Sequence, residues 1–281
     1  MKFGAHVSAS GGLWNAPEAA AALGCECFQF FTRSPQGGTP APITAETISR
    51  FKDACARFGF SEWYVHAPYF INLASAEERI RVGSIRVLRE ELARATKLGV
   101  KYLMTHLGSA KDVGKEAGVA LVVSGITKIL EGYNGSCQFL IEVSAGAGAV
   151  IGDRFEEIAE IVTAVEANGH AIGICFDTQH AFASGYDLRT PEALDETLAA
   201  FDRTVGLRRL KMSHCNDSKV ELGARKDRHE HIGAGAIGLE GFRLLVNHPK
   251  LADVNLIIET PFEGQLKDLE NLKALRSLKK S

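Results

Sequence analysis

Short hydrophobic runs alternate along this chain with longer segments whose apolar positions recur every three or four residues. The first pattern is typical of buried strands and the second of amphipathic helices. The predicted strands lie near residues 2–7, 26–32, 62–67, 101–107, 137–143, 172–178, 207–215 and 254–260. Their alternation with helical segments favours a parallel sheet built from strand–helix units.

Helical signals fill the intervals between these strands. The clearest predicted helices cover residues 17–24, 44–59, 75–99, 155–167 and 191–205, most of them followed closely by a glycine. Ser75-Ala76-Glu77-Glu78 has the sequence of a capping box at the start of one of them. Eight strand–helix units without a linker or low-complexity stretch predict one (β/α)₈ TIM barrel domain that spans residues 1–281.

In seven of the predicted strands, a short run of β-branched or aromatic residues stops at a histidine, aspartate or glutamate. These residues are His6, His66, His106, Glu142, Asp177, His214 and Glu259. The carboxyl ends of barrel strands converge on one face, which is where the active sites of such barrels lie. His180, just beyond the sixth strand, falls on the same face. One histidine there would more often be structural, but the repetition around the chain predicts a single shared site.

The chemistry of this set indicates metal binding. Imidazole nitrogens mixed with carboxylate oxygens suit hard or borderline cations. Asp227-Arg228-His229, in the loop after the seventh strand, adds two side chains that project the same way if the segment is extended. The complete set is too large for one ion. Zn²⁺ is the expected metal, and Mn²⁺ or Fe²⁺ would also be accepted at one site.

Composition adds little about the substrate but constrains the setting. The chain is 46% hydrophobic and 23% charged, with a formal net charge of −2, which argues neither for nor against nucleic acid. Its basic cluster of Lys219, Arg225, Lys226 and Arg228 is by itself as consistent with a solvated loop. No apolar run approaches the ~20 residues of a membrane helix. We expect a cytoplasmic protein with reduced thiols, because no signal peptide precedes the first strand and the six cysteines form no C-x-x-C pair.

Longer motifs occur in a fixed order along nearly the whole chain. They are His6–Gly12, Phe30–Arg33, His66–Leu73, Thr105–Gly108, Phe176–Asp187, His214–Lys219, Asp227–His229, Ile232–Gly235 and Ile258–Pro261. In these motifs the chain resembles the endonuclease IV family of metal-dependent abasic-site endonucleases. The resemblance departs from the family pattern in two loops, residues 34–38 and 143–148, which lack long polar side chains usual in that family.

The resemblance implies three zinc ions and a reaction. One ion would bind His66, His106 and Glu142. A second would share Glu142 and add Asp177, His214 and Glu259, and a third would use His180, Asp227 and His229. The reaction is hydrolysis of the phosphodiester 5′ to an abasic site in duplex DNA, which yields a 3′-hydroxyl and a 5′-deoxyribose phosphate. A metal-bridging hydroxide would attack phosphorus, with Glu142 bridging two ions and Glu259 orienting or deprotonating the water.

We further expect a surface that contacts DNA around this site. Its predicted members are His6, Ser8, Arg33, Gln36, Tyr69, Phe70, Asn216, Lys219 and Arg228. Tyr69 and Phe70 could wedge into the base stack of a kinked duplex, although Phe70 is equally suited to a core position. The expected partner is double-stranded DNA that contains abasic sites. We expect no membrane association and no obligate protein partner, and we expect a monomer.

Two other functional classes fit part of this pattern. A sugar isomerase or epimerase on the same barrel would need Glu142, Asp177, His214 and Glu259 around one metal. It would not need His66, His106, His180, Asp227 or His229, and these five residues favour the nuclease. A non-catalytic lesion binder is the other alternative. The complete ligand set argues against it, because a protein that no longer catalyses has no need of the whole set.

Overall fold

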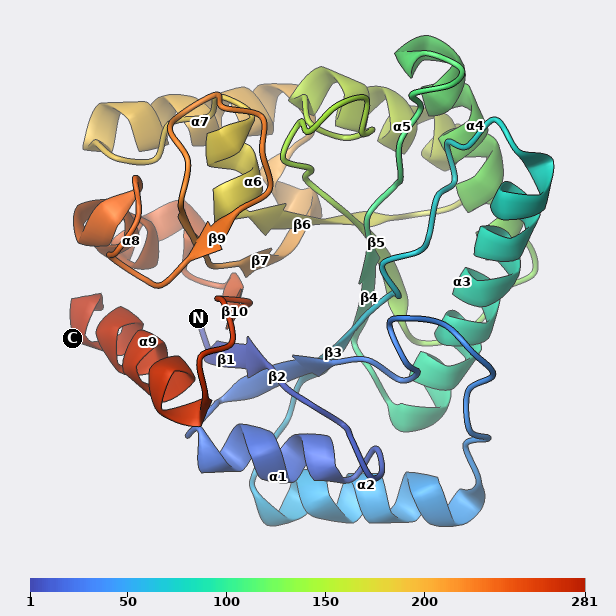
Figure 1. The fold of residues 1–281 in the computed structure, drawn as a ribbon, viewed down its shortest axis with the longest axis horizontal. Helices are drawn as coiled ribbons and strands as arrows, with labels where there is room; N and C mark the ends of the chain where they lie inside the picture. The colour runs from blue at the N-terminus through green and yellow to red at the C-terminus, as the bar shows by residue number, and fades with distance from the viewer. Residues whose placement is uncertain (281) are drawn as a thin grey trace.

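The computed structural model describes residues 1–280 and contains a closed barrel of eight parallel strands surrounded by helices (Figure 1). The barrel strands are β1 (Phe3–His6), β2 (Cys27–Phe30), β3 (Trp63–His66), β4 (Tyr102–Thr105), β5 (Gln138–Glu142), β6 (Gly173–Asp177), β7 (Leu210–His214) and β10 (Asn255–Ile258). Each strand pairs with its neighbours in chain order, and β1 closes the barrel against β10. The predicted (β/α)₈ fold is confirmed.

Helices follow the strands and form the outer layer of the molecule (Figure 1). They are α1 (Asn15–Ala22), α2 (Ala45–Arg57), α3 (Glu78–Leu98), α4 (Lys115–Leu130), α5 (Phe155–Ala167), α6 (Thr178–Ala183), α7 (Pro191–Thr204), α8 (Gly238–Asn247) and α9 (Gln265–Leu278). The short helix α6 and the hairpin of β8 (Asp217–Ser218) and β9 (His229–Glu230) are additions within the loops after β6 and β7. No helix among residues 1–280 combines the length and apolarity needed to cross a membrane.

Two local predictions differ from the structure. Residues 207–209 form a 3₁₀ turn, η1 (Leu207–Arg209), so β7 starts only at Leu210; a second such turn is η2 (Pro249–Leu251). The capping box at Ser75–Glu78 is wrong, because α3 begins at Glu78 and its N-cap residue Glu77 makes no side-chain cap. The Ser75 hydroxyl instead accepts a hydrogen bond from the Glu77 amide, in the turn before the helix.

Side-chain alternation along the strands separates two apolar regions. Residues that face outward pack with the helices in a large core that includes Phe28, Phe30, Val65, Leu103 and Ile141. Residues that face the barrel axis form a smaller cluster of Cys27, Tyr64, Met104, Leu140, Cys175, Met212 and Ile257. Because side chains repeat direction every two residues, the next inward position on each strand lies one layer nearer the carboxyl end. That layer carries the candidate site.

Candidate metal centre

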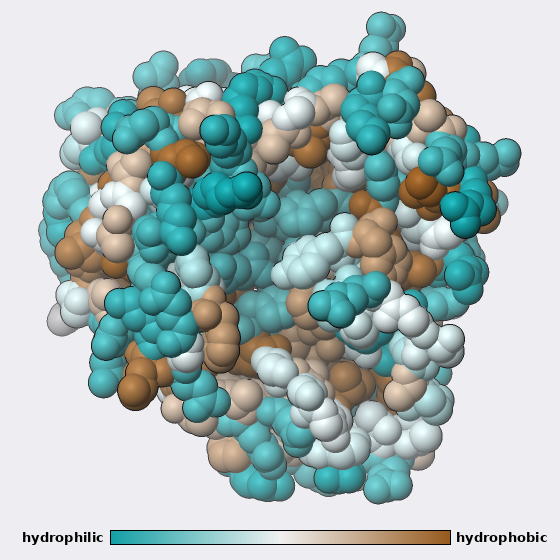
Figure 2. Space-filling view, viewed as in Figure 1, coloured by the Kyte–Doolittle hydropathy of each residue, from teal (hydrophilic) through white to brown (hydrophobic). Residues whose placement is uncertain are grey.

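A ring of polar side chains sits directly above the apolar cluster inside the barrel. Seven of its members lie two residues after a member of that cluster, and His6 lies two residues after Gly4. The eight are His6, Gln29, His66, His106, Glu142, Asp177, His214 and Glu259. Figure 2 shows a hollow near the middle of this face that is lined by hydrophilic residues. A cavity of about 260 Å³ opens there, bordered by His66, Tyr69, His106, His180, Asp227, His229 and Glu259. The strand-end residues singled out by the sequence therefore meet in one place.

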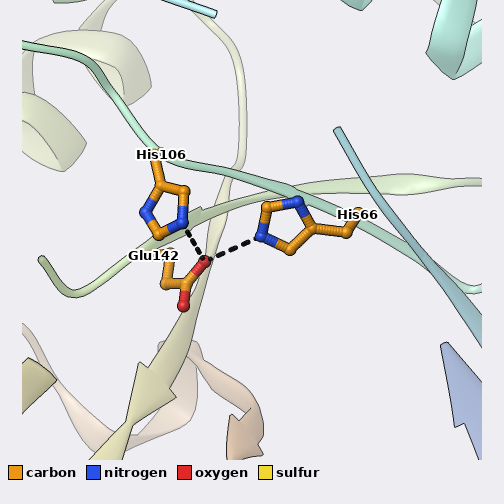
Figure 3. A group of neighbouring side chains, drawn as sticks. All are labelled: His66, His106 and Glu142. Atoms are coloured by element: carbon orange, nitrogen blue, oxygen red, sulfur yellow. Dashed lines mark hydrogen bonds and ion pairs between the residues drawn. The ribbon is translucent and has the colours of Figure 1, made fainter. Parts of the chain in front are cut away.

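The first group in this ring joins β3, β4 and β5. His66 Nε2 lies 3.2 Å and His106 Nε2 3.6 Å from the same oxygen, Oε2 of Glu142 (Figure 3). Glu142 is fully buried, and His66 is almost so. Two imidazoles and a carboxylate that converge in this way provide a three-atom donor set for a cation.

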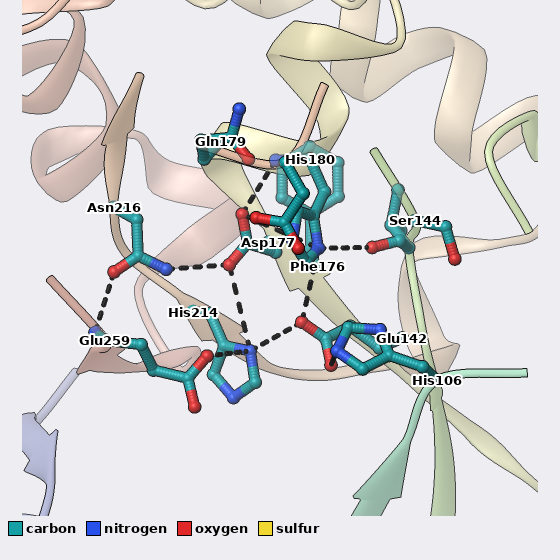
Figure 4. A network of polar contacts seen from close by, with 12 residues as sticks. His106, Glu142, Ser144, Phe176, Asp177, Gln179, His180, His214, Asn216 and Glu259 are labelled. Atoms are coloured by element: carbon teal, nitrogen blue, oxygen red, sulfur yellow. Dashed lines mark hydrogen bonds and ion pairs between the residues drawn. The ribbon is translucent and has the colours of Figure 1, made fainter. Parts of the chain in front are cut away.

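A second group uses the other oxygen of Glu142. His214 Nδ1 lies 2.7 Å from Glu142 Oε1, 3.2 Å from Glu259 Oε2 and 3.8 Å from Asp177 Oδ2 (Figure 4). Their donor atoms all lie within 4.8 Å of one another. Glu142 thus belongs to both groups, one oxygen facing each, which is the arrangement of a bridging carboxylate.

A third group lies toward α6 and the β8–β9 hairpin. The two Nε2 atoms of His180 and His229 are 3.4 Å apart. Asp227 places one oxygen 3.5 Å from His180 Nε2 and the other 3.4 Å from His229 Nε2. Asp177 also lies within reach of both rings. The structure therefore brings together all nine of the predicted ligand residues, in three overlapping groups.

Hydrogen bonds on the far side of the rings fix which nitrogen faces the site. The Nδ1 atoms of His66, His180 and His229 each donate to a backbone carbonyl, of Ala67, Val143 and Glu259 respectively, at 2.6 to 2.9 Å. Their Nε2 atoms are thereby left as lone-pair donors that point into the cavity. Such lone pairs repel when they face each other or a carboxylate. With both rings neutral, the facing Nε2 atoms of His180 and His229, beside Asp227, fit a divalent cation between them; without a cation, a proton on His180 takes its place.

The electrostatics of the cluster's own side chains agree with this donor set. Burial alone would raise the pKa of Glu142, but the charges of His106 and His214 hold that pKa well below its usual range. Burial would also raise the pKa of Glu259, but the charge of His214 and the hydrogen bond of His6 outweigh it and lower that pKa. The pKa of Asp227 falls to about 2, because hydrogen bonding and charge from His180 overcome its burial. These carboxylates are ionised at neutral pH and available to a cation.

The residues predicted to contact DNA divide into two sets. Ser8, Gln36, Tyr69, Phe70, Lys219 and Arg228 are at least partly exposed, and so is His6. Tyr69 and Phe70 are 65% and 44% exposed. An exposure of this size excludes the alternative that Phe70 belongs to the core.

The prediction that Arg33 and Asn216 contact DNA requires correction. The Arg33 guanidinium is buried in ion pairs with Glu90 and Glu91 of α3, 2.8 and 2.5 Å away. Asn216 is fully buried, where its amide donates to Asp177 Oδ2 and its oxygen accepts the Glu259 backbone N–H. Neither side chain reaches a duplex at the surface. Arg33 instead anchors the loop after β2, and Asn216 orients two members of the site.

Two buried residues of the site were not predicted from the sequence. Gln29 is the ring member from β2, the one barrel strand without a histidine, aspartate or glutamate where its apolar run stops. It contacts both Glu259 and His214. A signal existed in the register, since Gln29 is paired with His6. Asp217 accepts backbone N–H groups from Gly233, Gly235 and Ile237, and so holds the loop that follows His229.

Comparison with known proteins places this geometry in a family. Residues 17–280 match the family model described as xylose isomerase-like TIM barrel. A probable endonuclease 4 of Chloroflexus aurantiacus is 43% identical over 279 residues, which cover 99% of this chain and 98% of the relative. The probable endonuclease 4 of Haloarcula marismortui is 39% identical over 281 residues, which cover 99% of both chains.

Solved structures agree with the sequence relatives. The crystal structure of endonuclease IV from Thermus thermophilus superposes with a TM-score of 0.88 at 34% identity, and covers 99% of this chain and 98% of that one. By sequence and by fold, the chain belongs to the endonuclease IV family of metal-dependent nucleases, within the xylose isomerase-like TIM barrels.

Proposed function

We propose that this protein is a DNA repair enzyme that hydrolyses the phosphodiester 5′ to abasic sites in duplex DNA, leaving a 3′-hydroxyl and a 5′-deoxyribose phosphate. Its relatives at about 40% identity are probable endonucleases 4 along nearly their whole length. The observation that carries the proposal is the set of nine histidine and carboxylate side chains, which is larger than one or two ions need.

Three divalent cations, with zinc as the first candidate, fit the three groups. His66, His106 and Glu142 would hold one, and Glu142, Asp177, His214 and Glu259 a second. His180, Asp227 and His229 would hold the third. Bound cations would offset the charge of a phosphate and lower the pKa of a coordinated water from 15.7 to about 7.

The chain's own side chains supply orientation around the reacting phosphate. Glu259 Oε1 accepts a hydrogen bond from Gln29, which leaves Oε2 facing the cavity. Glu259 is therefore placed to orient an attacking water. Glu142 is buried and ionised and keeps two groups of donors in fixed relation. Exposed Tyr69 and Phe70 line a neighbouring cavity that also borders His106, His180 and Asp227, and from there they would enter a base stack opened at the lesion. Ser8, Gln36, Lys219, Arg228 and His6 would contact the backbone around them.

A sugar epimerase is the second candidate. The structure of a D-tagatose 3-epimerase-like protein superposes with a TM-score of 0.71, but at 21% identity this likeness concerns the fold alone. Glu142, Asp177, His214 and Glu259 would suffice for its single metal. The other five residues of the cluster would then have no role in the reaction.

The deciding experiment uses a duplex oligonucleotide with one tetrahydrofuran abasic analogue, which cannot undergo β-elimination. We expect purified, metal-loaded protein to nick the strand on the 5′ side of the analogue and to leave a 3′-end that a polymerase extends. Chelation should abolish the nick, and an undamaged duplex of the same sequence serves as the control. A metal-loaded preparation that binds about three ions but leaves the analogue intact would contradict the proposal. One bound ion, with turnover of a ketose sugar, would favour the epimerase.

A further inference from the structure

The ring above the barrel core contains one member that is neither histidine nor carboxylate. Gln29, on β2, is fully buried and has no route to the surface. A buried amide must have both its oxygen and its nitrogen hydrogen-bonded, or it costs stability. Gln29 meets that requirement entirely with residues of the metal centre, so its contacts show what it does there.

The amide oxygen of Gln29 determines how His214 faces the site. His214 Nε2–H donates to Gln29 Oε1 over 2.9 Å, and Nδ1 is then the atom left for Glu142, Asp177 and Glu259. His66, His180 and His229 use a backbone carbonyl for this purpose and present Nε2 instead. His214 is thus turned the opposite way from these three rings, and its acceptor is a side chain that can be substituted.

The amide nitrogen of Gln29 determines which oxygen of Glu259 is free. Gln29 Nε2 donates to Glu259 Oε1 over 2.6 Å, and the same nitrogen lies 2.9 Å from His6 Nδ1. His6 Nδ1 also lies 3.2 Å from Glu259 Oε1. Glu259 Oε1 is therefore held by Gln29 and His6, while Glu259 Oε2 faces His214 Nδ1. The single amide of Gln29 thus orients two donor atoms, Nδ1 of His214 at the end of β7 and Oε2 of Glu259 just after β10.

We infer that Gln29 is a positioning residue of the metal centre: it orients His214 to bind through Nδ1 and Glu259 to act through Oε2. This inference rests on the proposed function only in that His214 and Glu259 hold a cation. Gln29 touches none of His180, Asp227 and His229. Its loss should therefore weaken the second cation site and leave the third intact.

The main test variant is Gln29→Met, which is close in length and removes both hydrogen bonds. We expect its affinity for one of the bound zinc ions to fall by about 10–100-fold, the usual cost of removing such a supporting contact. Zinc content and competition with a chromophoric chelator measure this. On the abasic duplex, kcat should fall while KM is unchanged, because Gln29 does not reach the surface. Gln138→Leu, a change at the amino end of the barrel, is the control and should keep wild-type metal affinity.

A second variant separates the two hydrogen bonds. Gln29→Glu keeps an oxygen that accepts from His214 Nε2–H but places a carboxylate against Glu259 Oε1. In the zinc-loaded protein, NMR should show a slowly exchanging imidazole N–H signal of His214 in the wild type and in Gln29→Glu, and none in Gln29→Met. The corresponding Nδ1–H signals of His66, His180 and His229 should persist in both. Turnover should fall in both Gln29→Glu and Gln29→Met, because Glu259 is displaced in each variant.

The outcomes distinguish this inference from the proposed function. If the wild type holds no tightly bound cations, the metal centre itself fails and Gln29 has nothing to position. If the wild type binds zinc and Gln29→Met binds every ion within about twofold of it, with the His214 N–H signal retained, the inference is overturned. A lower melting temperature alone, without change in affinity or signal, would assign Gln29 a merely structural role and also overturn it.

Discussion

Whether the side chain of a strand residue points into this site depends on its position in the two-residue alternation of the strand. Met104 and Leu140 face the barrel axis, and His106 and Glu142, two positions later, face it one layer higher. A shift of one residue would turn each ligand toward the outer helices. The residue type at one position on each strand therefore decides whether that strand contributes a ligand-type side chain to the candidate metal centre, with no change to the apolar layer below.

Replacement of Glu259 by glutamine tests the chemistry of one such residue. The neutral amide keeps the shape of the side chain but removes the charge that we propose to orient water and to bind a cation. We expect turnover on the abasic duplex to fall by about 10²–10⁴-fold, the range for a lost acid–base group. Far-UV circular dichroism should match the wild type. Near-normal single-turnover rates would remove Glu259 from the mechanism.

Gly4 tests close packing inside the barrel. A Cβ atom on Gly4 would lie 2.0 Å from the carbonyl oxygen of Cys27 on the neighbouring strand. We expect Gly4→Ala to lower the free energy of unfolding by about 1–3 kcal/mol or more, since the backbones of β1 and β2 must move apart. Thermal unfolding measures it.

Gly83 provides the control for the same substitution. A Cβ atom there meets nothing within 4 Å, and Gly83 lies inside α3. Gly83→Ala should raise the free energy of unfolding by about 0.4–1 kcal/mol, because alanine has less chain entropy to lose. Equal melting temperatures for the two variants would contradict the packing argument.

At the scale of elements, the loop that carries Asp227 is held by an ion pair to a buried carboxylate of a neighbouring segment. Arg225, two residues before Asp227, donates to the Gly146 carbonyl and to Asp153 Oδ2, at 3.1 and 2.6 Å. Arg225 is the one non-glycine residue with positive φ among residues 1–280, at 55°. Asp153 is fully buried and also pairs with Lys115 of α4. The loop before β9 is thus tied to the β5–α5 loop and to α4.

Asp153→Asn tests this attachment. The change leaves Arg225 and Lys115 without their shared anion, and we expect a loss of about 1–3 kcal/mol, reduced because both cations are partly exposed. Hydrogen exchange measured by mass spectrometry should become faster in residues 222–228. The exposed pair Glu240–Arg243 is the control, and Glu240→Gln should leave exchange in that loop unchanged. Unchanged exchange in Asp153→Asn would show that the hairpin holds the loop unaided.

At the scale of the whole molecule, the apolar core and the metal centre are separate. The large core lies between strands and helices, and the axial cluster lies below the polar ring, so neither depends on a bound ion for its packing. Within the metal-free cluster, burial opposes a rise in the pKa of His180, but the charge of Asp177 and hydrogen bonds to Asp227 and Glu142 raise it well above its ordinary value. Protonated histidine can therefore offset part of the carboxylate charge when ions are removed.

Removal of metal should accordingly abolish activity without unfolding the barrel. We expect a chelator to eliminate cleavage of the abasic duplex while the far-UV spectrum is retained. The melting temperature should fall, because an ion present at about 100 times its Kd stabilises the folded state by about 2.7 kcal/mol. Added zinc should restore both properties. Collapse of the secondary structure on chelation would instead make the ions part of the folding core.

The fold and the strand-end members of the donor set could be predicted from sequence because both follow from local rules, whereas the division of the ligands among three ions came from the family resemblance. Strand and helix periodicity specify the (β/α)₈ order, and parallel closure then brings every strand end to one face. Residues such as His66, Glu142 and Asp177 are recognisable as polar groups where an apolar run ends. Their coming together needed only that closure.

The roles of Gln29, Arg33 and Asn216 were decided by tertiary structure alone. Whether a polar side chain reaches solvent or a buried partner depends on segments far away in sequence: Glu91 of α3 for Arg33, Asp177 and Glu259 for Asn216, His214 for Gln29. No local pattern encodes such a partner, because a hydrogen bond depends on distance and direction between chains that only the closed barrel brings together. The sequence by itself thus determined which side chains could hold metal, and the fold determined which atom of each side chain faces the site.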